Sequence, residues 1–284
     1  MDSKKRRLAC LALILALLAF RGLVRGAWHA QENGQLTITA LPVGKADALI
    51  VQQGGRTVVI DTGEEDDGAY LVKELKSRGA AKVDLLLITH FDKDHVGGAA
   101  CLVEHMEVSS VMMPDYEGSR PEYRAFLESL KGHPDVRRVA APEQFFAENM
   151  TFMIYPAENP GEIMDTDEEY DNGMSLVASL TYGAEKFLFA GDVEGVRIDQ
   201  MLSEDIDWRH DWLKLPHHGK YEDALTDFLD AVDPDMTVIC CSEKNPAEKK
   251  TLKLLEEKQT EVWDTSRKTV VTRSDGERIT VSME

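Results

Sequence analysis

The chain has few of the residues that cross-link a protein covalently. Its 284 residues include four cysteines, and their spacing shows no pattern typical of a disulfide framework. Cys101 lies near a predicted helix, and Cys240 and Cys241 are adjacent in a predicted strand, where their side chains point to opposite faces. We expect free, mostly buried thiols. The sequence also lacks an internal repeat and a long Pro/Gly/Ser linker, which excludes a repeat architecture.

Basic residues are scarce as well. The chain has 32 lysines and arginines against 51 acidic residues, which gives a formal net charge of −19. Proteins that bind nucleic acids tightly usually carry a track of basic residues. No basic cluster with interleaved aromatic residues occurs beyond the N-terminus. We therefore expect no high-affinity binding of nucleic acid, and a small-molecule partner suits the acidic surface better.

One long apolar run occurs, at the N-terminus. Residues 4–7 are all basic, and they precede thirteen apolar residues, 8–20. This pattern is typical of a secretory signal, and the run is short for an ordinary membrane-spanning helix. The cleavage site near Gly26 is weak, so residues 1–30 are expected to be either a signal peptide or an uncleaved anchor in residues 8–24. Either would place the protein outside the cytoplasm, secreted or membrane-anchored. An N-terminal helix of a cytoplasmic protein is the less favoured alternative.

Beyond the N-terminus, short apolar runs alternate with helical patterns, which predicts one α/β domain over residues 36–284. Helices are expected at residues 70–78, 121–131, 195–202, 224–232 and 246–258. Strands are expected at residues 48–53, 83–88, 175–180, 186–190 and 236–240. The acidic stretch 158–171 is expected to be a solvated loop near the functional site, with a lid over that site as the alternative.

The most informative segment is Thr-His-Phe-Asp-Lys-Asp-His at residues 89–95. It follows an apolar run typical of a buried strand, whose end lies at the rim of a sheet, where ligands bind. Side chains at His90, Asp92 and Asp94 alternate along an extended loop, whereas His95 breaks the alternation. One loop can therefore direct ligands at two neighbouring positions. An acidic surface loop would explain the carboxylates but not two of the eight histidines, so the segment indicates a metal site.

Three further strand ends carry side chains of the same kind. The apolar run 187–190 is followed by Asp192, whose two oxygens are good ligands for hard metals and could bridge two of them. Residues 212–215 lead to His217 and His218, and Asn172 precedes another predicted strand. Each of these alone is more simply a turn. Four strand ends that all carry His, Asp or Asn indicate a shared metal centre.

Taken together, these motifs resemble the metallo-β-lactamase superfamily, whose pattern is His-x-His-x-Asp-His. His90, Asp94 and His95 match this pattern. Asp92 stands where the second histidine usually stands, and the same replacement is typical of the hydrolase domain of ComEC-type competence proteins and their stand-alone relatives. The resemblance to that branch extends to residues 43–48, 60–63, 172–176, 190–192 and 216–219. It implies an αββα sandwich with the metal site at the strand ends.

The chain departs from the branch pattern at two places. Lys45 and Ala46 stand where the pattern has Gln and Gly, and Lys220 stands where a Ser usually follows His-His-Gly. Neither change removes an expected ligand. Both reduce what the resemblance implies about the substrate.

The chemistry and the resemblance imply two divalent metal ions. An oxygen-rich site and a mixed site are expected to share Asp192, and the replacement by Asp92 favours manganese, with zinc close behind. His217 is the preferred ligand of its pair and His218 the substrate-facing acid, with the reverse order open. The expected metal ligands are His90, Asp92, Asp94, His95, Asn172, Asp192 and His217.

The implied activity is a hydrolase in which a hydroxide between the two ions attacks a phosphoester. The expected catalytic residues are Asp94, His218 and Lys220, with His218 protonating the leaving oxygen and Lys220 holding a phosphate oxygen. Asp61 is expected either to orient a ligand histidine or to cap a turn. The alternative function is hydrolysis of a lactone, thioester or β-lactam. A non-catalytic binding module is less favoured, because the ligand positions are intact.

Overall fold

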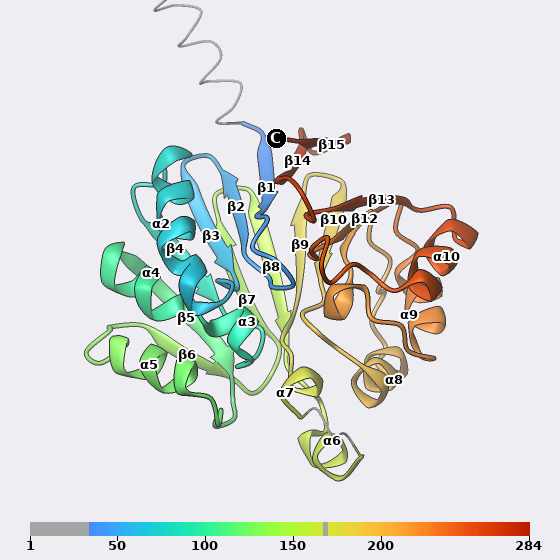
Figure 1. Cartoon of the computed structure of the whole chain (residues 1–284), viewed down its shortest axis with the longest axis horizontal. Helices are drawn as coiled ribbons and strands as arrows, with labels where there is room; N and C mark the ends of the chain where they lie inside the picture. The colour runs from blue at the N-terminus through green and yellow to red at the C-terminus, as the bar shows by residue number, and fades with distance from the viewer. Residues whose placement is uncertain (1–33, 167–169) are drawn as a thin grey trace, which may run out of the picture.

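The computed structural model describes residues 34–166 and 170–284. They form two mixed β-sheets that pack face to face, and helices cover the outer face of each sheet (Figure 1). The predicted αββα sandwich is therefore confirmed.

The first sheet has the strand order β15-β14-β1-β2-β3-β4-β5-β6. Strands β3 to β6 run parallel, so that their carboxyl ends meet at one edge, whereas β14, β1, β2 and β3 pair antiparallel. The strands are β1 Leu36–Ala40, β2 Leu49–Gln53, β3 Arg56–Ile60, β4 Val83–Leu87, β5 Val108–Pro114, β6 Val136–Val139, β14 Val270–Ser274 and β15 Ile279–Met283.

The second sheet has the order β13-β12-β11-β10-β9-β8-β7. Strands β10 to β13 run parallel, and β7 to β10 pair antiparallel. The loops that leave β10 and β11 therefore emerge on the same edge of this sheet. The strands are β7 Glu143–Ala147, β8 Met150–Tyr155, β9 Val177–Tyr182, β10 Glu185–Phe189, β11 Trp212–Lys214, β12 Met236–Ile239 and β13 Glu261–Asp264.

Helices from the two halves of the chain cover opposite outer faces (Figure 1). On the first sheet lie α2 Gly68–Ser77, α4 Ala99–His105 and α5 Pro121–Ser129. On the second lie α8 Gly195–Ser203, α9 Leu225–Val232 and α10 Lys249–Glu257. The remaining helical segments are short: η1 Glu65–Asp67, α3 Lys93–Val96, α6 Pro160–Thr166, α7 Tyr170–Gly173 and η2 Pro216–Gly219.

The strands are apolar on both faces because each sheet is covered twice. In β4, Leu85 and Leu87 face the opposite sheet, whereas Leu86 packs under the helices. The layer between the sheets is filled by large side chains such as Phe187 and Trp212. Since alternate residues of a strand point to opposite faces, a doubly covered strand reads as a continuous apolar run. These cores fix the strand ends that carry the polar loops.

Each predicted helix and strand is present, with ends displaced by at most three residues. Cys240 packs between the sheets and Cys241 packs under the outer helices, as the alternation predicts, and both are free thiols. Cys101 is a free, half-buried thiol.

The solvated loop predicted at 158–171 is wrong, because α6 lies within this stretch and α7 begins in it. Pro160 is the first residue of α6 and Glu162 lies in its first turn, and both residue types favour a helix start. The acidic composition concealed this signal.

The signal segment predicted for residues 1–30, including the anchor in residues 8–24, lies outside the described residues. Within the part of the chain that the structure describes, no helix is both long and apolar enough to cross a membrane.

Candidate metal centre

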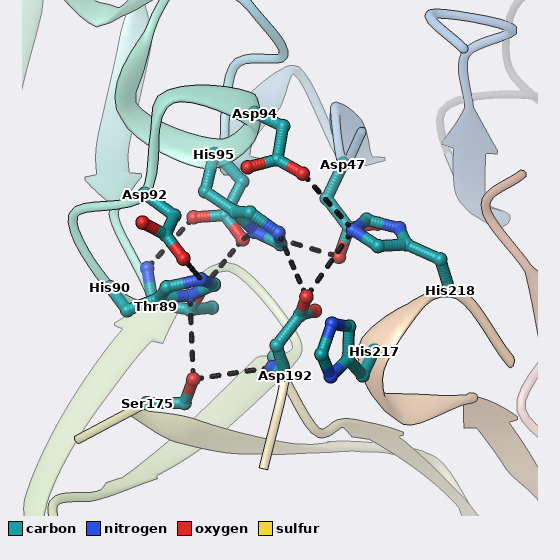
Figure 2. A network of polar contacts seen from close by, with 12 residues as sticks. Asp47, Thr89, His90, Asp92, Asp94, His95, Ser175, Asp192, His217 and His218 are labelled. Atoms are coloured by element: carbon teal, nitrogen blue, oxygen red, sulfur yellow. Dashed lines mark hydrogen bonds and ion pairs between the residues drawn. The ribbon is translucent and has the colours of Figure 1, made fainter. Parts of the chain in front are cut away.

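The predicted strand-end loops meet at one edge of the sandwich, between the two sheets (Figure 2). The loop after β4 and the short helix α3 bring His90, Asp92, Asp94 and His95. Asp192 follows β10, and the histidine pair 217–218 follows β11 in η2. Figure 2 shows the imidazole rings gathered around the carboxylate of Asp192.

Three imidazole nitrogens point into the cluster without a hydrogen bond. The Nε2 atoms of His90, His95 and His218 are buried and have no hydrogen-bond partner among the described residues. Asp192 Oδ2 lies 3.3 Å from Nε2 of His95 and 3.2 Å from Nε2 of His218. An unsatisfied buried nitrogen is costly, and most buried polar groups avoid this state. Three such atoms in one cluster, two of them beside the same carboxylate oxygen, fit a site that holds metal ions.

Three overlapping groups of donors lie close enough to hold an ion. Donor atoms of His90, His95 and Asp192 lie within 4.8 Å of one another, and so do those of Asp94, His95 and His218. The third group, Asp47, Asp61 and His95, lies behind the ring of His95, where both carboxylates face Nδ1. Imidazole nitrogens and carboxylate oxygens are common ligands of Mn²⁺, Fe²⁺ and Zn²⁺. The donor chemistry therefore fits divalent metals, with more than one position available.

The other nitrogen of each ring is held from behind. Nδ1 of His95 lies 2.8 Å from Asp61 Oδ2, and Nδ1 of His218 lies 2.9 Å from the backbone oxygen of Cys240. Such contacts fix the ring and the tautomer, so that Nε2 is presented to the site. Asp61 also accepts hydrogen bonds from the backbone nitrogen and hydroxyl of Thr89, at 2.8 and 2.7 Å. Asp61 thus orients a candidate ligand and is more than a turn cap.

A hydroxyl network holds His90. Its Nδ1 lies 3.0 Å from Thr89 Oγ1 and 3.3 Å from Ser175 Oγ. Ser175 Oγ also accepts a hydrogen bond of 3.2 Å from the backbone nitrogen of Asp192. The backbone nitrogen of Ser175 in turn donates to the oxygen of Asn172 at 3.0 Å, which places buried Asn172 of α7 beside this network. The two halves of the fold are therefore joined directly under the cluster.

The carboxylates of the cluster favour bound positive charge, carried by protons or by metal ions. Burial, reinforced by nearby His95, lowers the pKa of His90 to about 4. Burial also disfavours the charged form of His218, but Asp192 and other carboxylates outweigh it and raise its pKa to about 10. In the same way, Asp192 and Asp61 hold the pKa of His95 well above its ordinary value. Metal ions would replace these protons, because a protonated imidazole cannot be a ligand.

An unusual backbone turn separates the two adjacent histidines. His217 and His218 both adopt left-handed conformations, with φ of 45° and 52°, and Gly219 follows with φ of 82°. Non-glycine residues in this region cost of order 1–3 kcal/mol each, and they concentrate at functional sites. The turn sets the two imidazole planes at 74° to each other. As a result, only one of the two rings enters the cluster.

That ring belongs to His218. His217 directs Nδ1 to the carboxylate of Glu194 instead, and Figure 2 shows its ring beside Asp192. Its ring packs edge-on against that of His218, with the centroids 6.0 Å apart. The geometry therefore favours the reverse of the preferred order, with His218 as the candidate ligand. Lys220 donates a hydrogen bond of 2.7 Å to the same oxygen of Glu194, so it too lies outside the cluster.

Asp92 lies at the edge of the cluster. Its Oδ2 is 3.9 Å from His90 Nε2, and its Oδ1 accepts hydrogen bonds from Arg120 at 2.9 Å and 3.2 Å. Asp94 Oδ2 lies 3.5 Å from His218 Nε2. Both loop carboxylates thus face an imidazole nitrogen.

Sequence reasoning missed the roles of Asp47, Lys214 and Arg120. Lys214 is buried next to Asp192 and forms an ion pair with Asp47. The lysine in the otherwise apolar run 212–215 was a usable signal, because a buried lysine needs a partner. Arg120, which lies just before α5, carries no comparable signal in the sequence.

A family model of the metallo-beta-lactamase superfamily matches residues 41–243. The chain belongs to this superfamily. Curated relatives include ComE operon protein 3 of Bacillus subtilis, 24% identical over 73% of this chain and 28% of that protein. Recombination protein 2 of Haemophilus influenzae is 23% identical over 82% of this chain and 27% of that protein. These matches confirm the ComEC-type resemblance, and the chain spans less than a third of each relative.

Solved structures show the same fold at low identity. YhfI of Bacillus subtilis, a metallo-beta-lactamase fold protein, has a TM-score of 0.52 and 11% identity, with 87% of this chain and all of that chain covered. Igni18 of Ignicoccus hospitalis has a TM-score of 0.53 and 16% identity, with 83% of this chain and 98% of that chain covered. The CmlA beta-hydroxylase E377D mutant has a TM-score of 0.55 and 16% identity, with 84% and 54% covered.

Proposed function

We propose that this protein is a hydrolase that holds two divalent metal ions and cleaves a phosphoester. The observation that carries the proposal is the cluster of three buried, unsatisfied imidazole nitrogens, two of which contact Asp192 Oδ2, while His90 shares a donor group with Asp192. One ion would bind between His90, Asp92 and Asp192, with Asn172 nearby. The other would bind between Asp94, His95 and His218, and would share Asp192. Manganese or zinc suits these donors.

The charges of the cluster support two ions rather than one. Four carboxylates lie in it or directly behind it: Asp47, Asp61, Asp94 and Asp192. Lys214 contacts Asp47 and Asp192, while Asp92 has Arg120 as its own partner. With neutral histidines, one divalent ion would leave the cluster negative, whereas two would offset the carboxylates and the attacking hydroxide. Two ions would thus remove the repulsion of an anionic substrate such as a phosphoester.

Bound divalent ions would lower the pKa of a water molecule and neutralise charge on the phosphoryl oxygens. The side chains of this chain then supply orientation. Asp61 and the oxygen of Cys240 hold two of the imidazole rings in place. His217 and Lys220 both contact Glu194. In the reversed order of the pair, His217 would be the substrate-facing acid, and Lys220 would hold a phosphate oxygen. Lys220 is 40% exposed and can reach an anionic substrate.

Several features bear on the choice between a phosphoester and a carbonyl substrate. Asp92 makes the first metal position rich in oxygen. The name of one relative refers to recombination, and recombination acts on DNA, whose linkages are phosphodiesters. The net charge of −19 argues for a small phosphodiester, or for a nucleic acid held only at the metals. Igni18, which shares the fold, is described as a metallo hydrolase.

The test compares turnover of bis(p-nitrophenyl) phosphate with turnover of a lactone and a β-lactam, on the full chain loaded with Mn²⁺ or Zn²⁺. We expect metal-dependent cleavage of the phosphodiester that falls below detection in Asp192→Ala. Cleavage of only the lactone or β-lactam would establish the carbonyl alternative. Bound metal without any turnover would support a binding module.

We also propose that the protein acts outside the cytoplasm, secreted or anchored through residues 8–24. The basic and apolar pattern of residues 4–20 supports this location. Fractionation of the producing cells, with the mass of the mature chain, would test it: an intact chain in the cytoplasm contradicts the proposal.

A further inference from the structure

We infer that Lys214 and Asp47 form a buried positioning pair, which aims one oxygen of Asp192 and the ring of His218 at the metal ions. The inference rests on the proposed function and deepens it. Neither residue is a candidate metal ligand in the assignment above. Both residues act through candidate ligands: Lys214 contacts Asp192, and Asp47 lies next to His218.

Lys214 is the last residue of β11, and its side chain is 1% exposed. Its ammonium contacts Asp47 Oδ2, lies 3.4 Å from Asp192 Oδ1 and donates a hydrogen bond of 3.0 Å to the backbone oxygen of Gly191. A buried charge is tolerated only when partners replace its hydration shell. These three acceptors satisfy the ammonium and fix its position on the inner wall of the site.

The ammonium divides the two oxygens of Asp192 between different partners. Oδ1 faces Lys214, whereas Oδ2 faces Nε2 of both His95 and His218. Asp192 therefore presents a single oxygen to the cluster, although its two oxygens were expected to bridge two ions. Without Lys214 the carboxylate could rotate and offer both oxygens to one ion. The lysine thus favours sharing of Oδ2 between two ions.

Asp47 lies behind the two imidazoles that Asp192 Oδ2 faces (Figure 2). Its Oδ1 is 3.4 Å from Nδ1 of His218, and its Oδ2 is 3.8 Å from Nδ1 of His95. Asp47 Oδ1 makes no hydrogen bond with the described residues, and Nδ1 of His218 bonds to Cys240, so Asp47 acts on the His218 ring through its charge. Its backbone nitrogen donates to the oxygen of Asp94 at 3.1 Å. Asp47 therefore links the loop after β1, the ligand loop after β4 and strand β11. Through Lys214 it couples the position of His218 to that of Asp192.

The same division of oxygens occurs at Asp92 on the outer side of the site. Arg120 holds Oδ1, and Oδ2 faces His90. The two carboxylates are thus oriented by two different cations. Arg120 is half exposed, whereas Lys214 is buried, so the inner pair is the more constrained of the two.

The test must separate positioning from stability, because Lys214→Met alone would leave Asp47 buried without its cation. The double variant Lys214→Met/Asp47→Asn removes both charges at nearly constant volume. Lys186→Met, at a half-exposed lysine of β10, is the matched control. Thermal unfolding of the metal-free proteins reports on the fold, and calorimetric titration with Mn²⁺ or Zn²⁺ reports on each metal position.

We expect the double variant to unfold cooperatively near the wild-type Tm but to bind one of the two ions roughly 10- to 100-fold more weakly. The control should match the wild type in both readouts. Wild-type affinity for both ions in the double variant would overturn the inference and leave the pair a merely structural role.

Asp47→Asn alone keeps the contact of Lys214 with Asp192, so it remains testable if the double variant fails to fold. Asp47→Asn should also lower the affinity for one of the two ions, and unchanged affinity would overturn the inference. A wild-type protein that binds no ion would instead refute the proposed function.

Discussion

The two halves of the molecule contribute to the candidate metal centre in different ways. The N-terminal half supplies its candidate ligands from one loop, His90 to His95, directly after β4. The C-terminal half supplies Asp192 and His218 from two separate strand ends. Ligands of one loop are held by local geometry, whereas ligands from separate loops depend on tertiary contacts. The second half should therefore be the more sensitive to changes outside the ligands.

The cations that orient the carboxylates differ in the same way. Arg120 reaches Asp92 from a half-exposed position, and Lys214 reaches Asp192 from the buried inner wall. An exposed ion pair contributes about 0–1 kcal/mol, whereas breaking a buried pair is strongly destabilising. The outer cation can thus be removed alone without risk to the fold, whereas the inner cation can be replaced only together with its partner Asp47.

The largest effect is expected for the histidines of the C-terminal half. His218→Ala should remove a ligand and weaken one of the two ions by more than about 100-fold, which exceeds the usual effect of supporting residues. His217→Ala, the matched control from the same turn, should retain both ions, because His217 contacts Glu194 instead. Metal titration of the two variants distinguishes them, and equal losses would contradict the assignment.

A smaller effect is expected in the N-terminal half. Arg120→Met should weaken the ion near His90 by about 10-fold, because Asp92 loses the contact that directs Oδ2 inward. The Tm of the metal-free protein should stay within error, since the pair is exposed. A drop in Tm comparable to that of Lys214→Met would remove the difference between the two cations.

The smallest effect concerns Glu222, which accepts a hydrogen bond of 2.5 Å from the backbone nitrogen of Gly195 at the start of α8. Burial, together with the charge of Glu194, raises the pKa of Glu222 from 4.5 to about 7. The unfolded chain ionises first, so this residue should cost stability as the pH rises from about 4.5 to about 7.

In Glu222→Gln this loss should disappear, a difference of about 1 kcal/mol after allowance for solvent screening. Urea unfolding of both proteins at pH 5 and pH 8 measures it. Parallel pH dependence in the two proteins would show that Glu222 ionises normally in the fold.

The sequence indicated that His90, Asp92, Asp94 and His95 lie together because they are adjacent and follow a buried strand, and their role as ligands stays a prediction. It left the order of His217 and His218 open, because the choice depends on a left-handed turn that the residue types do not encode. The pairing of Lys214 with Asp47 joins positions far apart in the chain, so no local pattern reveals it. The helices α6 and α7 were missed because acidic composition was given more weight than Pro160 at a helix start.

Metal content, measured by mass spectrometry on the full chain after loading with Mn²⁺ or Zn²⁺ and removal of free ions, tests the central claim most directly. The proposed dinuclear centre predicts two ions per chain in the wild type, with Asp192 Oδ2 beside both His95 and His218. One ion or none would contradict a dinuclear centre. The clustered imidazoles would then be balanced against the carboxylates by bound protons.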